Sequence, residues 1–165
     1  AAAQVGAVTA VAFESITDNE SDGGAMWIGT DRGVLVVERS GRTTELTSGN
    51  SSLPPGSVRT IYCGRDNTKW IAVSNKGVAC VDAAFNWASY DRSGGLGSDD
   101  SVAIAEDHQG NLWFGTINGA TELVMAKPTP KKQPHSDRAM GRSLPAACIA
   151  IRAGAQAFVC DPERV

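Results

Sequence analysis

Three tryptophans recur at a fixed interval in this chain. Trp27, Trp70 and Trp113 are separated by 43 residues and then by 43 residues again, and the chain has only 4 tryptophans. Their surroundings also repeat, as Met-Trp-Ile-Gly-Thr, Lys-Trp-Ile-Ala-Val and Leu-Trp-Phe-Gly-Thr. A period of about 40–50 residues indicates a supersecondary unit that packs against copies of itself. The repeat therefore limits the possible folds more than any other feature of the sequence.

Each repeat unit predicts a set of short strands. In the third unit, residues 102–106 and 112–116 have strand character and are separated by the turn sequence Asp-His-Gln-Gly-Asn. Asn118-Gly119 is a strong hairpin signal and leads into a third strand over 120–124. A fourth strand is expected over 42–47 in the first unit and 86–91 in the second.

Four antiparallel strands every forty-odd residues are typical of the blade of a β-propeller. A meandering β-sandwich is the competing all-β architecture, but it requires no fixed period. We therefore predict an all-β chain of about three to four propeller blades, which form a partial propeller or one completed by oligomerisation. The expected parts are blade 1 at about 8–52, blade 2 at about 53–95, blade 3 at about 96–125, a spacer rich in Pro and Lys at 126–142, and a degenerate fourth unit at 143–165.

The third unit carries a family resemblance. Residues 102–119 read Val-x-Ile-x-Glu-Asp-x-x-Gly-Asn-Leu-Trp-Phe-Gly-Thr-x-x-Gly, which closely resembles the two-component regulator propeller repeat. The resemblance extends over about residues 8–124. It implies a propeller like those in the extracytoplasmic sensor region of bacterial hybrid two-component regulators. It therefore also implies ligand or partner binding without catalysis, a carbohydrate-derived ligand, and a periplasmic or extracellular location.

Two other functions are compatible with this repeat. A self-assembling short-propeller lectin would use regularly spaced aromatic side chains to bind carbohydrate. A lyase-like propeller enzyme is the other alternative, because related repeats occur in streptogramin-lyase-like propellers. The chain offers no clear counterpart of the histidine and magnesium site of those enzymes, so we predict neither a catalytic residue nor a cofactor.

The number of repeats raises a question of closure. Propellers typically close with about 4–8 blades, whereas this chain has three clear units and a partial fourth, which leaves strand edges exposed. Three explanations stay open. The first is that the chain is a fragment of a larger propeller. The second is that copies of the chain associate through their exposed blade edges and form a homo-oligomer. The third is that the C-terminal segment supplies strands that complete a small, irregular assembly.

Candidate ligand-binding residues stand out in two places. Trp87 is the tryptophan outside the 43-residue lattice, and Tyr90 follows it closely. His108 lies in the turn before Trp113, where it is either an exposed turn residue or a base oriented by a neighbouring carboxylate. We call Trp27, Trp70 and Trp113 the lattice tryptophans, because they are spaced by 43 residues. These three are expected to pack between neighbouring sheets.

An acidic turn in the first unit is a weak candidate for calcium. Asp18, Glu20 and Asp22 place carboxylates on alternate residues, as at the start of a calcium loop, but the twelfth position is Gly29 rather than a carboxylate. Asp and Gly are also common in turns without a metal. We therefore predict no metal site beyond this candidate.

The four cysteines divide into two pairs. Cys63 and Cys80 are expected on the first and third strands of the second unit, about 9–10 Å apart, so we predict that both are free. Cys148 and Cys160 would lie opposite each other in a hairpin that turns at Gly154, which makes them a disulfide candidate.

Composition excludes several kinds of partner. The formal net charge of −3 is unlike the basic surface of a nucleic-acid-binding protein. The longest uncharged apolar runs are too short for a membrane span. The basic, proline-rich spacer is either a solvated loop or a contact for an acidic partner.

Overall fold

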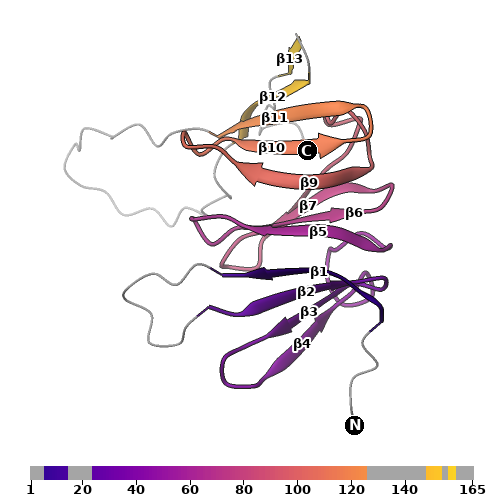
Figure 1. Cartoon of the computed structure of the whole chain (residues 1–165), viewed down its shortest axis with the longest axis vertical. Helices are drawn as coiled ribbons and strands as arrows, with labels where there is room; N and C mark the ends of the chain where they lie inside the picture. Colours follow the sequence, from indigo (N-terminus) through magenta and orange to yellow (C-terminus); the bar gives the residue numbers. More distant parts are fainter. Residues whose placement is uncertain (1–5, 15–23, 126–147, 154–155, 159–165) are drawn as a thin grey trace, which may run out of the picture.

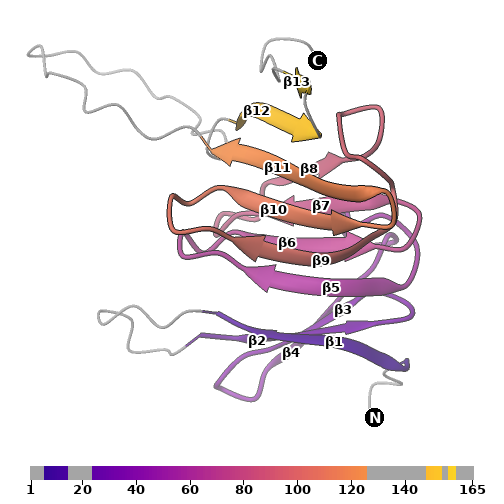
Figure 2. The same cartoon turned by 45° about the horizontal axis from the view of Figure 1, so that its top comes forward.

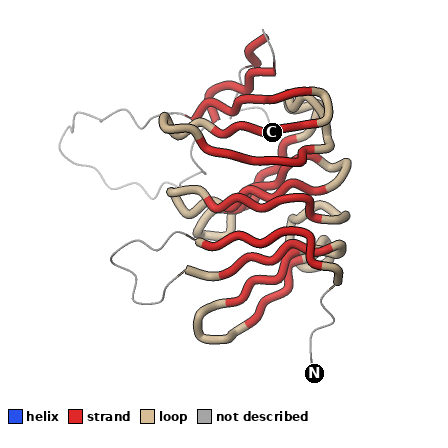
Figure 3. Tube along the Cα trace, viewed as in Figure 1, coloured by secondary structure: helices blue, strands red, loops and turns tan. Residues whose placement is uncertain are grey.

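The computed structural model describes residues 6–14, 24–125, 148–153 and 156–158, and for the last two segments only the backbone. These residues form three antiparallel sheets, and no helix occurs among them (Figure 3). The strands are β1 (Val8–Phe13), β2 (Met26–Thr30), β3 (Val34–Val37), β4 (Thr43–Leu46), β5 (Val58–Cys63), β6 (Lys69–Val73), β7 (Gly77–Val81), β8 (Trp87–Tyr90), β9 (Ser101–Glu106), β10 (Leu112–Thr116), β11 (Gly119–Met125), β12 (Cys148–Ala153) and β13 (Gln156–Phe158).

Each sheet is one blade of a partial propeller. Blade 1 has the strand order β1-β2-β3-β4, blade 2 has β5-β6-β7-β8, and blade 3 has β13-β12-β11-β10-β9. The blades follow one another along the molecule, and their first strands, β1, β5 and β9, lie side by side (Figures 1 and 2). The predicted propeller blades with four-stranded sheets are thus confirmed for the first two units.

Blade 3 obtains its outer strands from the segment that was expected to begin a fourth unit. β12 pairs with β11, with Leu123 opposite Ile151, and β13 pairs with β12. β11 would otherwise end blade 3 with an unpaired edge, and β12 covers that edge as β4 covers β3 and β8 covers β7. Among the described residues, β12 and β13 therefore extend the third sheet.

Two hydrophobic cores hold the blades together. The core between blades 1 and 2 contains Trp27, Val34, Val36, Leu46, Leu53, Val58, Ile61, Cys63, Ile71, Val73, Ala79 and Val81. The core between blades 2 and 3 contains Trp70, Ala72, Val78, Cys80, Leu96, Leu112, Phe114 and Leu123. Because strand side chains alternate between faces, blade 2 supplies odd-numbered residues of β6 to one core and even-numbered residues to the other. Its β6 and β7 are consequently buried along their whole length.

Candidate functional site

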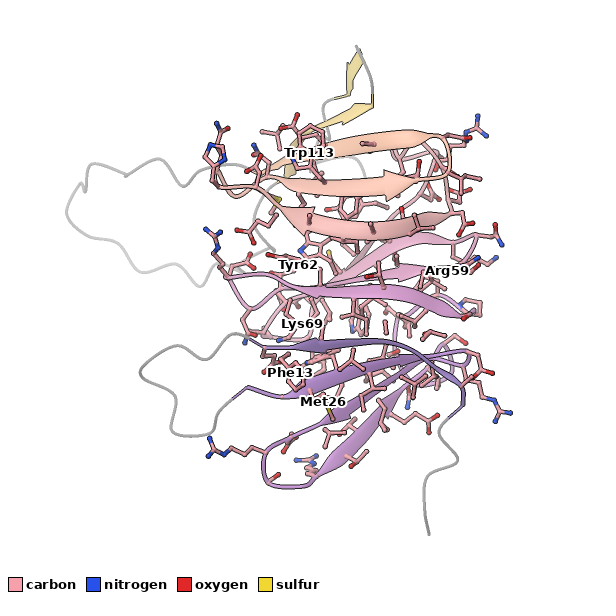
Figure 4. All side chains as sticks on the ribbon, viewed as in Figure 1. Phe13, Met26, Arg59, Tyr62, Lys69 and Trp113 are labelled. Atoms are coloured by element: carbon pink, nitrogen blue, oxygen red, sulfur yellow. The ribbon has the colours of Figure 1, made fainter. Side chains whose placement is uncertain are left out.

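The carboxyl ends of β1, β5 and β9 lie at one edge of the stack (Figure 1, left). Polar side chains gather there between neighbouring blades, on or just after these inner strands or, for Lys69, at the start of β6 (Figure 4). We call this the inner-strand cluster, and define it as Glu14, Tyr62, Arg65, Lys69 and Glu106. It consists of two bridges, one between each pair of neighbouring blades.

The first bridge joins Lys69 of blade 2 to Glu14 of blade 1. Lys69 Nζ lies 2.6 Å from Glu14 Oε1 and donates to Asn67 Oδ1 at 2.8 Å, although its side chain is only 5 % exposed. The same ammonium group lies 5.3 Å from the centroid of the Trp27 ring, whose indole N–H donates to Glu14. Burial alone would raise the pKa of Glu14. The hydrogen bonds from Lys69, the Ala25 amide and the indole lower that pKa below its ordinary value.

The second bridge joins blade 2 to blade 3. The Tyr62 hydroxyl donates to Glu106 Oε2 at 3.0 Å, and Arg65 Nε lies 3.5 Å from Glu106 Oε1. Burial, together with the hydrogen bond to a carboxylate, raises the pKa of Tyr62 to about 12. Tyr62 therefore stays protonated at neutral pH, whereas the Arg65 side chain is 71 % exposed and open to a ligand.

Trp113 lies on β10 opposite Ala105 of β9, on the face of blade 3 that is turned away from this bridge. The Trp113 indole N–H donates to Asp107 Oδ2 at 3.2 Å, and Asp107 also accepts hydrogen bonds from Gln109 and Asn111. Slight desolvation raises the pKa of Asp107, but these hydrogen bonds outweigh it and lower the pKa to about 2. Asp107 is therefore a fixed carboxylate at neutral pH.

A further ionic contact joins blades 2 and 3 at the amino ends of their inner strands. Arg59 Nε lies 3.6 Å from Asp100 Oδ1 and donates to Ser74 Oγ at 3.3 Å. Arg59 is labelled in Figure 4 on the side opposite Tyr62. Both ends of the inner strands thus carry a charged contact between blades 2 and 3.

The structure does not bring the predicted ligand-binding residues together. Trp87 is half-buried on β8 and packs against the core between blades 1 and 2. Tyr90 is half-buried on the opposite face of β8 and stacks on Trp70, with ring centroids 5.8 Å apart. His108 is exposed in the turn between β9 and β10. Ligand contact by these three residues stays a prediction.

The lattice tryptophans behave in two ways. Trp27 and Trp70 are buried between sheets, as predicted, and are 2 % and 3 % exposed. Trp113 is 40 % exposed, so the expectation that it packs between sheets is wrong for the described residues. The reason is that its side of blade 3 faces no further sheet among them.

The cysteine and calcium predictions have different outcomes. Cys63 and Cys80 are free and buried, on β5 and β7 with β6 between them, as predicted. Burial raises the pKa of each thiol to about 11. Cys160, Asp18, Glu20 and Asp22 lie outside the described residues, so the disulfide and the calcium site stay predictions. The β12–β13 register pairs Ile151 with Phe158, one residue away from the hairpin assumed for that disulfide.

Sequence reasoning missed the inner-strand cluster, although a signal was present. Lys69 occupies the repeat position held by Met26 and Leu112, and Glu106 occupies the position of Cys63. A charged residue at a repeat position that is otherwise apolar indicates a special contact. Within the described part of the chain, no three His, Cys, Asp or Glu side chains are grouped closely enough to hold a metal ion. None of the described residues forms a helix that could cross a membrane.

Comparison with known proteins supports the repeat and the fold. The family model described as two component regulator propeller matches residues 95–118, which confirms the resemblance predicted for the third unit. The chain is similar to the extracellular domain of BT3049, described as a hybrid two component system of B. thetaiotaomicron, with 24 % identity and a TM-score of 0.58. That match covers 71 % of this chain but 15 % of the other. No curated protein matches the chain.

Two further solved structures share the fold. The extracellular domain of BT4673, described as a one component system of B. thetaiotaomicron, has 20 % identity and a TM-score of 0.57, over 74 % of this chain and 17 % of that one. A catalytically inactive virginiamycin B lyase from Staphylococcus aureus, crystallised with quinupristin, has 17 % identity and a TM-score of 0.55. It is matched over 75 % of this chain and 40 % of its own. At these identities the similarity establishes the β-propeller fold and leaves activity open.

Proposed function

We propose that this chain is a non-enzymatic sensor propeller module that acts outside the cytoplasm and binds a carbohydrate-derived ligand at the inner-strand cluster. The two-component regulator propeller repeat at residues 95–118 supports the sensor role and the location. The observation that carries the choice of site is the pair of Tyr62 and Arg65 around Glu106, at the edge where the inner strands end.

The chemistry of this pair suits a ligand with hydroxyl and carboxylate groups. Arg65 is exposed, and a guanidinium group presents a planar fork of N–H donors that fits a carboxylate. Tyr62 is protonated at neutral pH and donates its proton to Glu106, so its hydroxyl oxygen can accept a hydrogen bond from a ligand hydroxyl. An acidic sugar would therefore bind more tightly than its neutral counterpart.

The test is titration calorimetry with acidic and neutral oligosaccharides chosen from a glycan screen. We expect Arg65→Gln to weaken binding of an acidic sugar by about tenfold or more, the equivalent of one charged hydrogen bond. Arg42→Gln is the matched control, because Arg42 is equally exposed and also pairs with a glutamate, in the turn between β3 and β4. Equal binding by the two variants, or no glycan binding by the wild type, would contradict the proposal.

The two alternatives have weaker support. A lectin that stacks sugars on its lattice tryptophans cannot use Trp27 or Trp70, because both are buried. A lyase-like enzyme has the fold similarity in its favour, but His108 stands in an exposed turn without a metal cluster among the described residues. Magnesium-dependent cleavage of a streptogramin by this chain would overturn the non-enzymatic proposal.

A further inference from the structure

The inner strands of the three blades share an irregularity near their amino ends. The register of β5 against β6 shifts between Val58 and Thr60, so Arg59 is the extra residue of a β-bulge. β1 shifts at the equivalent place, between Val8 and Ala10, and the pairing of β9 with β10 is also irregular there. A bulge leaves its extra residue out of the ladder and turns that side chain in a new direction. In blade 2 the residue turned in this way is an arginine.

The edge at these amino ends is polar between blades 2 and 3 but apolar between blades 1 and 2. The strand registers place Ser101 of β9 at the repeat position of Val58 of β5, with Asp100 directly before it. Val58 is fully buried in the core between blades 1 and 2 and lies against Gly29. At the next interface Ser101 takes the place of that valine, and Asp100 Oδ1 lies 3.6 Å from Arg59 Nε. Polar groups thus replace an apolar contact at one of two equivalent places.

Two of these polar atoms have no hydrogen-bond partner. Ser101 Oγ and Asp100 Oδ1 are both buried, and neither makes a hydrogen bond within the described part of the chain. Ser101 is 0 % exposed, and the Arg59 Nε atom is too far from Asp100 Oδ1 for a hydrogen bond. Buried polar groups are nearly always paired, because an unpaired one has given up its bonds to water without replacement. Two such atoms on consecutive residues indicate a place where a partner binds.

The size of the side chain does not explain the serine. β6 and β9 are in contact, and Ala72 of β6 occupies the repeat position of Gly29. The extra Cβ of Ala72 leaves less room for the residue opposite than Val58 has against Gly29. A smaller residue is therefore required at position 101, but alanine would meet that requirement without placing a hydroxyl group in an apolar contact. The hydroxyl of Ser101 needs a separate explanation.

The charges at this edge select the kind of partner. Asp100 carries a negative charge and Arg59 a positive one beside it, so the first opposes an anion and the second opposes a cation. A hydroxyl group suits both residues, because it donates a hydrogen bond to the carboxylate and accepts one from the guanidinium group. The partner that fits is therefore uncharged and rich in hydroxyl groups.

We propose that the amino edge between blades 2 and 3 binds a neutral sugar through two adjacent hydroxyl groups, which pair with Asp100, Ser101 and Arg59. The Arg59 side chain is 48 % exposed, and its Nε lies 3.3 Å from Ser74 Oγ and 3.6 Å from Asp100 Oδ1. Both contacts are long, so the guanidinium group is held loosely and turns outward to admit the ligand. One sugar hydroxyl then donates to the Asp100 carboxylate and accepts from Arg59, and its neighbour pairs with the Ser101 hydroxyl.

This site is separate from the inner-strand cluster. Arg59 and Tyr62 lie toward opposite ends of β5, as their labels in Figure 4 show. The inner-strand cluster presents the exposed Arg65 and favours an acidic ligand, whereas the charges of Arg59 and Asp100 balance each other. The inference therefore does not rest on the proposed function, and the two sites are distinguished by the charge of the sugar that each prefers.

The experiment is titration of the isotope-labelled full chain with glucose, galactose, mannose and xylose, followed through its amide NMR signals. We expect at least one of these sugars to give saturable shifts at residues 57–60 and 99–101. Cyclohexanol, which has a single hydroxyl group, should give none. Asp100→Asn and Arg59→Gln should each weaken binding by about tenfold or more, and Ser101→Ala by about threefold or more.

Ser101→Ala also separates a binding role from a structural one. Removal of an unpaired buried hydroxyl should leave the free energy of unfolding unchanged or raise it, so weaker binding by this variant does not come from misfolding. Arg65→Gln is the control for location and should leave binding of the neutral sugar unchanged. No saturable shift with any of these sugars, binding unaffected by Asp100→Asn or Arg59→Gln, or binding lost in Arg65→Gln would each overturn the inference. The proposed function is tested by the acidic sugar, so either idea fails without the other.

Discussion

At the residue scale, Lys69 shows how one repeat position acquires a charge. Its equivalents in the other units are Met26 and Leu112, and a lysine in the same buried place is tolerated only with a partner. Glu14 and Asn67 supply the acceptors, and the Trp27 ring lies beside the ammonium group. The repeat pattern could not predict this pair, because Glu14 and Lys69 are brought together by the packing of two blades.

We expect Lys69→Met to destabilise the chain by about 3 kcal/mol, because it leaves the half-buried Glu14 carboxylate without its counter-charge. Urea denaturation of the wild type and of Lys69→Met measures this loss as a difference in the free energy of unfolding. Adding Glu14→Gln should recover much of the loss, because the methionine can then pack between blades as Leu112 does in blade 3. If the double variant is less stable than the single one, the loss comes from packing and not from the charge.

The pH dependence of this pair has a defined sign. The pKa of Glu14 is lowered in the folded state from an ordinary value of 4.5, so the stabilisation is present above that value. It is lost as the pH falls through the lower, folded pKa. The difference in unfolding free energy between wild type and Lys69→Met should therefore shrink below about pH 4.5. A difference that is constant from pH 7 to pH 3 would contradict the ion-pair explanation.

At the element scale, the strands were predictable because the sequence repeats. The predicted strands over 102–106, 112–116 and 120–124 agree with β9, β10 and β11, and those over 42–47 and 86–91 contain β4 and β8. The place of β12 was not predictable, because it depends on which strand edge is free after a long spacer. Such pairing between distant segments leaves no mark in local sequence.

The turns between strands give a prediction at the same scale. Gly77 has a φ of +79°, and a Cβ there would collide with the carbonyl oxygen of Tyr90, whereas Gly41 has a similar φ of +83° with open space around it. Gly41→Ala should therefore lower the unfolding free energy by the backbone strain alone, about 1 kcal/mol. Gly77→Ala should lower it by clearly more. Chemical denaturation of both variants tests this, and equal losses would show that the close contact with Tyr90 is easily relaxed.

At the scale of the whole molecule, burial is distributed unevenly over the three blades. Both faces of blade 2 are covered, whereas Val11 and Phe13 of blade 1 and Trp113 of blade 3 are 51 %, 67 % and 40 % exposed. Regions with few buried contacts open with a smaller free energy than the core does. We therefore expect the described parts of blades 1 and 3 to open locally more easily than blade 2.

Hydrogen exchange makes this difference measurable. The amides of β6 and β7, which are buried along their whole length, should exchange most slowly, and those of β2, β3 and β10 should exchange faster. Equal protection in β2, β6 and β10 would contradict the idea that cover on both faces of blade 2 sets its local stability.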